Sequence, residues 1–115
     1  MKKYPIKNMK EFIAMTRTVK ETSNVIKQQH GLTYEELYIL VYVYENRLPA
    51  YNVKDIITIS SFKPYYITKA LQKLKEQGYL SKKRNEQDER TVIIEITKDQ
   101  YEKIDQLFKQ IEAMF

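Results

Sequence analysis

Residues 64–96 constrain the fold most, because a basic amphipathic helix is followed at once by a charged β-hairpin. Apolar residues at three- and four-residue spacing predict a helix over 64–77 that stops at Gly78. The segments 79–84 and 90–96 are β-type runs that flank a short polar tip. A helix followed directly by such a hairpin is the layout of a winged helix-turn-helix.

The first part of the chain predicts two long helices. A stripe of apolar residues at helical spacing predicts a first helix over residues 8–29. Thr33 and Glu36 have the spacing of a capping box, which predicts the start of a second helix that runs to about Glu45. This second helix is apolar on nearly all sides, and such a helix belongs in the middle of a structure.

Shorter elements and one last helix complete the predicted fold. Residues 48–51 predict a turn and a very short strand, and Asn52 is the expected cap of a short third helix. Residues 60–63 then form the turn of the helix-turn-helix. Thr97 opens a second capping box and begins a helix that runs to about Met114.

The predicted fold class is α+β, mostly helical with one small β-hairpin. The expected order is helix, helix, strand, helix, helix, strand, strand, helix. A length of 115 residues predicts one winged-helix domain over 1–115, and 43% hydrophobic and 30% charged residues indicate a globular chain. The helix-turn-helix falls at about 53–77 and the wing at about 79–96.

Composition excludes several kinds of site. Cysteine is absent, which excludes disulfides and thiolate metal ligands. His30 is the only histidine, no glycine-rich phosphate loop is present, and no serine has a nucleophile context, so we expect no catalytic residue, metal or cofactor. No stretch approaches the ~20 apolar residues of a membrane span, and the N-terminus lacks an apolar signal core. We therefore expect a cytoplasmic protein with no membrane partner.

Positive charge is concentrated in one segment of the chain. The formal net charge is +5, but residues 63–84 alone hold seven cations against one anion, Glu76, for +6. The rest of the chain therefore has a net charge of −1. A local excess of this kind is the electrostatic footprint of a protein that holds nucleic acid. We expect double-stranded DNA as the partner.

The predicted helix over 64–77 has a face that could enter a major groove. Ile67, Ala70, Leu71 and Leu74 share the opposite, core-facing side. Lysine can donate to guanine, glutamine can pair with adenine, and tyrosine can donate to phosphate. The alternative is an ordinary solvated helix face. The helix residues predicted to contact DNA are Lys63, Tyr65, Tyr66, Thr68, Lys69, Gln72 and Lys73.

The predicted hairpin is stronger evidence for DNA binding than the helix, because three cations follow one another at its base. Their mutual repulsion stabilises nothing in the free fold, whereas an anionic partner explains it. Arg84 and Arg90 are expected to face each other, and Arg84 to enter a narrow A·T-rich minor groove. The alternative is a solvated tip with surface ion pairs worth about 0–1 kcal/mol. The predicted wing contacts are Lys82, Lys83, Arg84 and Arg90, with Asp88 and Glu89 shaping the wing.

The first and last predicted helices both carry broad apolar stripes. These stripes could cover the second helix within one chain, or they could pack against their counterparts in a twofold dimer. We favour a homodimer through the terminal helices, because reading two half-sites about 34 Å apart requires a fixed spacing between two winged helices.

The segments 62–75, 80–84 and 88–93 closely resemble the SarA family of staphylococcal regulators, a branch of the MarR-like winged-helix superfamily. The resemblance extends over about 33–97. It implies a homodimer that binds A·T-rich promoter DNA and regulates virulence genes, as repressor, activator or both. It also maps the family's major-groove helix onto residues 63–77 and its wing motif onto Arg84, Asp88, Glu89 and Arg90.

Two other functions stay open from sequence alone. A winged helix can serve as a protein-interaction module that docks on another regulator or a polymerase subunit, although the +6 segment disfavours this. The chain could also be an effector-sensing, MarR-like repressor with a ligand between its helices. Enzymatic activity has no support in the sequence.

Overall fold

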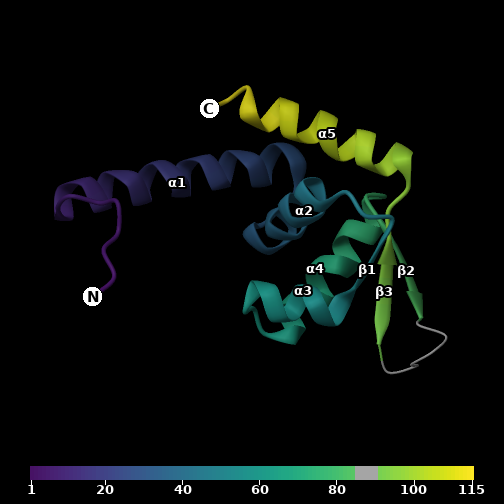
Figure 1. Cartoon of the computed structure of the whole chain (residues 1–115). Coiled ribbons are helices and arrows are strands. Elements are labelled where there is room, and N and C mark those ends of the chain that lie inside the picture. The colour runs from purple at the N-terminus through teal and green to yellow at the C-terminus, as the bar shows by residue number, and fades with distance from the viewer. Residues whose placement is uncertain (85–90) are drawn as a thin grey trace. The chain divides into compact units, whose positions relative to one another are not determined.

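A computed structural model describes residues 1–84 and 91–115 of the chain (Figure 1). These residues form two compact units, Met1–Thr33 and Tyr34–Phe115. Within the described residues the element order is the predicted one, with five helices and three strands. None of the described helices has the length and hydropathy that a membrane crossing needs. The wing predictions for Asp88, Glu89 and Arg90 lie outside the described residues.

The first unit is a short N-terminal arm followed by one long helix, α1 (Met9–His30). Asn8 caps the helix, and its side chain accepts a hydrogen bond from the Glu11 N–H at 2.8 Å. The helix stops at Gly31, as predicted, because φ there is 68°, a left-handed conformation that glycine adopts without strain. The apolar stripe of the helix is exposed at Met9, Phe12, Ile13, Met15 and Val19.

The second unit contains the helix-turn-helix. Asn52 caps the third helix as predicted, because its side chain accepts a hydrogen bond from the Lys54 N–H at 2.9 Å. Ser61 has a left-handed φ of 59° and begins the turn, and Pro64 occupies the first helical position after it. The helices of this unit are α2 (Tyr34–Asn46), α3 (Val53–Ser60), α4 (Pro64–Glu76) and α5 (Lys98–Glu112).

Three antiparallel strands form a sheet in the order β1-β3-β2, with bounds β1 (Ala50–Asn52), β2 (Ser81–Arg84) and β3 (Val92–Glu95). Arg84 pairs with Val92, so the prediction that Arg84 faces Arg90 is wrong. The register places Ile94 on the covered face, where it is fully buried, whereas the neighbouring Glu95 on the other face is exposed. A shift of one residue would turn Ile94 to the solvent side.

The core of the second unit is centred on α2, which packs against both α4 and α5 (Figure 1). The predicted inner face of α4 is confirmed, because Ile67, Ala70, Leu71 and Leu74 are all buried. Helix α5 buries five residues of its apolar stripe, and Met114 and Phe115, which follow the end of the helix, are exposed. Burying Leu and Ile side chains contributes about 1.5–3 kcal/mol each, so this packing fixes α4 to the body of the unit.

Candidate nucleic-acid interface

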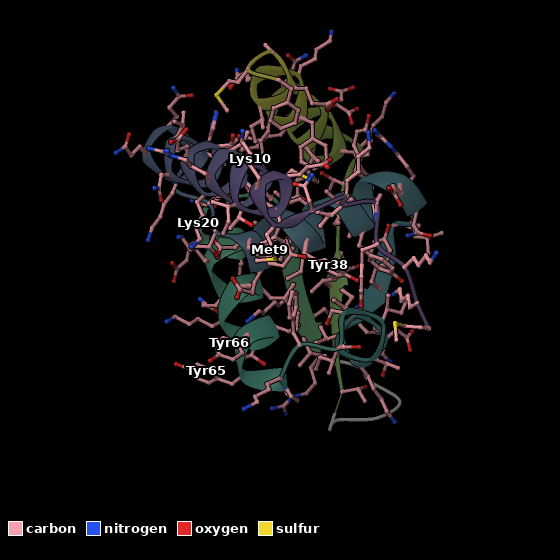
Figure 2. All side chains as sticks on the ribbon, turned by 90° about the vertical axis from the view of Figure 1, so that its left-hand side faces the viewer. Met9, Lys10, Lys20, Tyr38, Tyr65 and Tyr66 are labelled. Carbon is pink, nitrogen blue, oxygen red and sulfur yellow. The ribbon has the colours of Figure 1, made fainter. Side chains whose placement is uncertain are left out.

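The first half of α4 presents its outer face to solvent. Tyr65 and Tyr66 are 68% and 49% exposed, and their ring centroids lie 5.6 Å apart at an interplanar angle of 74°. Figure 2 shows both side chains projecting from the beginning of α4 away from the core. Thr68 and Lys69 are also exposed. Two aromatic rings, a hydroxyl and a cation therefore lie on the surface of the same two turns.

Lys63 occupies the N-cap position of α4, with an extended backbone and no side-chain cap hydrogen bond. Its carbonyl accepts a hydrogen bond from the Tyr66 N–H at 3.0 Å. The N-terminal end of a helix carries a partial positive charge, and a lysine beside it raises the local positive potential further. This end of α4 is therefore suited to an anion such as a phosphate.

An aromatic cluster holds the turn before α4 against α2. The Phe62 ring lies 5.2 Å from the ring of Tyr38 and 5.8 Å from that of Tyr34, edge-on in both cases. Edge-to-face aromatic pairs contribute about 0.5–1.5 kcal/mol each beyond the area they bury. The neighbouring Lys63 is thus anchored through its backbone while its side chain remains exposed.

The second half of α4 differs, because Gln72 and Lys73 have partners inside the fold. Lys73 Nζ lies 3.2 Å from Oε1 of Glu36, a residue of α2 whose side chain is only 7% exposed. A buried carboxylate is costly unless it is paired with a cation. Lys73 therefore neutralises Glu36 and joins the two helices.

Gln72 connects α4 to the first strand of the wing. Lys82 Nζ donates a hydrogen bond to Gln72 Oε1 at 3.1 Å, and Gln72 Nε2 donates to Glu76 Oε1 at 3.2 Å. Partial burial and the nearby Lys75 lower the pKa of Lys82, while Glu76 opposes the shift. The side chains of Lys83 and Arg84, further along β2, are exposed.

The described residues that the sequence predicted as DNA contacts lie on two elements joined by the Lys82–Gln72 hydrogen bond, but the sequence did not indicate the partners of Lys73 and Gln72. The available signal was Glu36 in the largely apolar α2, because a carboxylate that a core helix buries requires a cation from elsewhere in the chain. Within residues 1–84 and 91–115, no group of three or more histidine, aspartate and glutamate residues is arranged to hold a metal ion.

Comparison with known proteins identifies the family. Residues 21–107 match the family model described as the transcriptional regulator SarA/Rot. The HTH-type transcriptional regulator SarR of Staphylococcus aureus (strain USA300) is 42% identical over 107 residues, which cover 93% of this chain and 93% of that protein. The predicted resemblance to the SarA family is therefore confirmed.

Solved structures confirm the fold. The crystal structure of overoxidised AbfR bound to DNA superposes with a TM-score of 0.74 at 19% identity, covering 90% of this chain and 74% of that one. The crystal structure of MarR gives a TM-score of 0.71 at 19% identity, covering 94% and 77%. The winged helix-turn-helix is thus of the MarR type. The chain belongs to the SarA/Rot family, and it is a transcriptional regulator of the helix-turn-helix type and not an enzyme.

Proposed function

We propose that this regulator binds duplex DNA through the first half of α4 and the edge strand β2. One observation carries the proposal: four cations on these two elements, Lys63, Lys69, Lys83 and Arg84, are exposed and form no ion pair with any described residue. The Lys82–Gln72 hydrogen bond joins the two elements, so these cations belong to one surface. The fold is also that of AbfR, whose structure was solved with DNA bound.

The helix residues divide into contacts and supports. We assign Lys63 and Lys69 to phosphates, and Tyr65, Tyr66 and Thr68 to base edges or the sugar-phosphate backbone. We assign Lys73 as the partner of Glu36, whose negative charge reduces the attraction of Lys73 to DNA. In the wing, Lys83 contacts phosphate and Lys82 adds positive potential while it holds Gln72. Arg90 remains a wing contact proposed from the sequence, with Asp88 and Glu89 proposed to shape the wing.

We propose a preference for A·T-rich DNA from the side chains that α4 has available for base contacts. Gln72 is the only amide side chain between Pro64 and Glu76, and both ends of its amide are already bonded within the fold. The bidentate contact by which glutamine reads adenine would require breaking those bonds. Thr68 and the tyrosine rings can instead contact thymine methyl groups, and Arg84 can enter a narrow A·T-rich minor groove.

We also propose that two copies pair through the terminal helices, as the exposed stripe of α1 suggests. Val19 is 63% exposed and Ile13 58%, although large apolar side chains on a helix are usually covered. A groove of about 360 Å³ on this unit is lined by Ile6, Phe12, Met15 and Val19 among others, and it could accept apolar side chains of a second copy. Pairing would set two winged helices at a fixed half-site spacing.

The proposed setting is the cytoplasm, where promoter DNA is found, and the family resemblance suggests virulence genes as the targets. The first test is a titration of an A·T-rich promoter duplex against salt. Six to ten phosphate contacts by a dimer predict a loss of affinity of about 10³-fold or more between 50 and 200 mM salt. A flat salt dependence, with a tight protein partner recovered instead, would favour the interaction module.

Two wing variants separate shape recognition from phosphate binding. Arg84→Ala should weaken binding to A·T-rich duplexes more than to mixed-sequence duplexes, because it removes a minor-groove side chain. Lys83→Ala should weaken binding to both equally, because phosphate contacts carry no sequence information. If the two variants behave alike on both duplexes, the proposed minor-groove role of Arg84 is wrong.

A further inference from the structure

The C-terminal end of α4 is held by two side chains of α5. Lys103 Nζ donates a hydrogen bond to the carbonyl of Gln77, the C-cap residue of α4, and lies 4.4 Å from the ring centroid of Tyr79. Gln100 Nε2 donates to the carbonyl of Gly78 at 3.3 Å. These contacts cross more than twenty residues of sequence and converge on the turn between α4 and β2.

The amide of Gln100 is fixed from its other side by the capping box of α5. Its Oε1 accepts a hydrogen bond from the Thr97 N–H at 2.9 Å, while Thr97 Oγ1 accepts from the Gln100 N–H at 3.1 Å. With the oxygen committed to Thr97, the amide nitrogen is aimed at Gly78. A single glutamine therefore both starts α5 and holds the end of α4.

The turn itself leaves little room for adjustment. Gly78 has a φ of +82°, and a Cβ added there would lie 3.1 Å from Lys103 Nζ. The N–H of Tyr79 donates to the carbonyl of Leu74 at 3.0 Å, which closes the last turn of α4 directly before β2 begins. The lysine cation also complements the partial negative charge at this helix end.

Helix α5 is itself firmly attached to the body of the unit. On its neighbouring face, Asp105 accepts a hydrogen bond from Arg47 Nη1 at 3.1 Å, and the Tyr101 and Tyr51 hydroxyl oxygens are 2.7 Å apart. These contacts join α5 to the α2–β1 corner. The first two turns of α5 thus span both ends of the helix-turn-helix segment.

We propose that Lys103 and Gln100 are positioning residues for DNA recognition, which set the tilt of α4 from its C-terminal end. The inference rests on the proposed function. Tyr65 lies about 18 Å along the helix axis from Gln77, so a tilt of about 5° would displace Tyr65 by about 1.6 Å. A displacement of that size breaks hydrogen bonds to base edges but leaves diffuse attraction to phosphates largely intact.

Two substitutions test this role. Lys103→Met keeps an aliphatic chain over Tyr79 but removes the charge and the donor, and Gln100→Glu keeps the acceptor for the Thr97 N–H but removes the donor to Gly78. Lys109→Met, an exposed lysine in the last turn of the same helix, is the matched control. The readouts are the affinities for a promoter duplex and for a random duplex of equal length, the salt dependence of each, and the unfolding temperature.

For the double variant, measured well below its unfolding temperature, we expect promoter affinity to fall about tenfold, the cost of one mismatched contact. Affinity for the random duplex and the salt slope should not change. Replacing Lys103 by arginine instead of methionine (Lys103→Arg) should restore promoter affinity, because a guanidinium can donate to the Gln77 carbonyl and stack on the Tyr79 ring. Lys109→Met should match the wild type.

Three results would overturn the inference. If the unfolding temperature falls but the ratio of the two affinities is preserved, the contacts are structural only. If Lys103→Arg fails to restore the ratio, the donor is not the cause. If both affinities fall together, the contacts do not act on recognition. Lys69→Met tests the proposed function independently of this inference. If Lys69→Met leaves DNA binding unchanged, the proposed function fails, whatever the Lys103 and Gln100 variants show.

Discussion

Lys69 and Lys73 lie one turn apart on the same helix and have different roles. Lys69 is exposed and forms no ion pair with any described residue, whereas Lys73 pairs with the buried carboxylate of Glu36. The difference comes from the neighbouring element and not from the helix. Lys73 lies where α4 crosses Glu36 of α2, while Lys69 lies nearer the N-terminal end of α4. Positive charge on a recognition helix is therefore an unreliable guide to DNA contact.

The same contrast divides the whole of α4. Its first half offers side chains with no partners among the described ion pairs, and its second half is bonded to α2, β2 and α5 through Lys73, Gln72 and the Gln77 carbonyl. Because the second half of α4 is bonded to its neighbours, the first half keeps a defined orientation while its outer side chains are free to contact a ligand. Substitutions in the two halves should therefore change different measurements.

The largest effect is expected from Lys73→Met, and it should fall on stability. Removing one partner of a buried ion pair costs about 3–5 kcal/mol, and we expect about 1–3 kcal/mol here because the lysine is partly exposed. Urea denaturation measures the loss. The double variant Glu36→Gln/Lys73→Met should recover part of it, because the buried negative charge is removed together with its cation. An unchanged free energy of unfolding would show that the pair contributes nothing.

Lys69→Met should have the opposite profile. The free energy of unfolding should change by less than about 0.5 kcal/mol, as is usual for an exposed position. Affinity should fall on promoter and random duplexes alike, and the slope of log affinity against log salt should decrease by about 1. Fluorescence anisotropy titrations at several salt concentrations measure both. A salt slope equal to that of the wild type would show that Lys69 does not contact a DNA phosphate.

Gln72→Ala should have a smaller effect on DNA affinity, and the effect should come from weaker support of the wing strand β2. Losing the hydrogen bond to Lys82 removes about 0.5–1.5 kcal/mol of support for β2. Binding to A·T-rich duplexes should therefore weaken in the same way as with Arg84→Ala, without a new preference at any single base pair. Competition with singly substituted duplexes tests this. The loss of a preference for adenine at one position would instead identify Gln72 as a base reader.

The smallest effect is expected from Tyr79 and only in alkali. Burial raises the pKa of Tyr79 above its ordinary value of 10.0, so the folded state holds the phenol proton more tightly than the unfolded state. The resulting stability is complete below pH 10 and is lost as the pH rises towards and through the folded-state pKa. Tyr79→Phe should make the decline shallower in urea denaturation between pH 9 and 11. An identical decline in both proteins would contradict this assignment.

The local features of the fold could be predicted from sequence because they depend on near neighbours. The inner face of α4, the caps at Asn52 and Thr97 and the stop at Gly31 all follow from periodicity or from residues three or four apart. The pairing of Arg84 with Val92 did not follow, because strand register depends on which side chain the assembled core covers.

The supports of the candidate site were also beyond sequence reasoning. Glu36 and Lys73 are 37 positions apart, and Lys103 and Gln77 are 26 apart, so only the tertiary fold brings the members of each pair together. Gln72 and Lys73 have the residue types of a DNA-contacting face. Glu76, four residues after Gln72, is a partner that helical spacing could indicate, but Lys82 and Glu36 are too distant in sequence to be inferred in this way. The sequence thus predicted a DNA-binding surface but did not indicate which of its side chains have partners inside the fold.

The most direct measurement is photo-crosslinking to a promoter duplex from two positions of the full chain. A benzophenone side chain replaces Tyr65 on the outer face of α4 in one protein, and exposed Glu102 on α5 in the other. We expect strong crosslinks to DNA from the position of Tyr65, which weaken with added salt, and none from that of Glu102. Crosslinks from Glu102 but not from Tyr65 would contradict the assignment of the DNA-binding surface to the first half of α4.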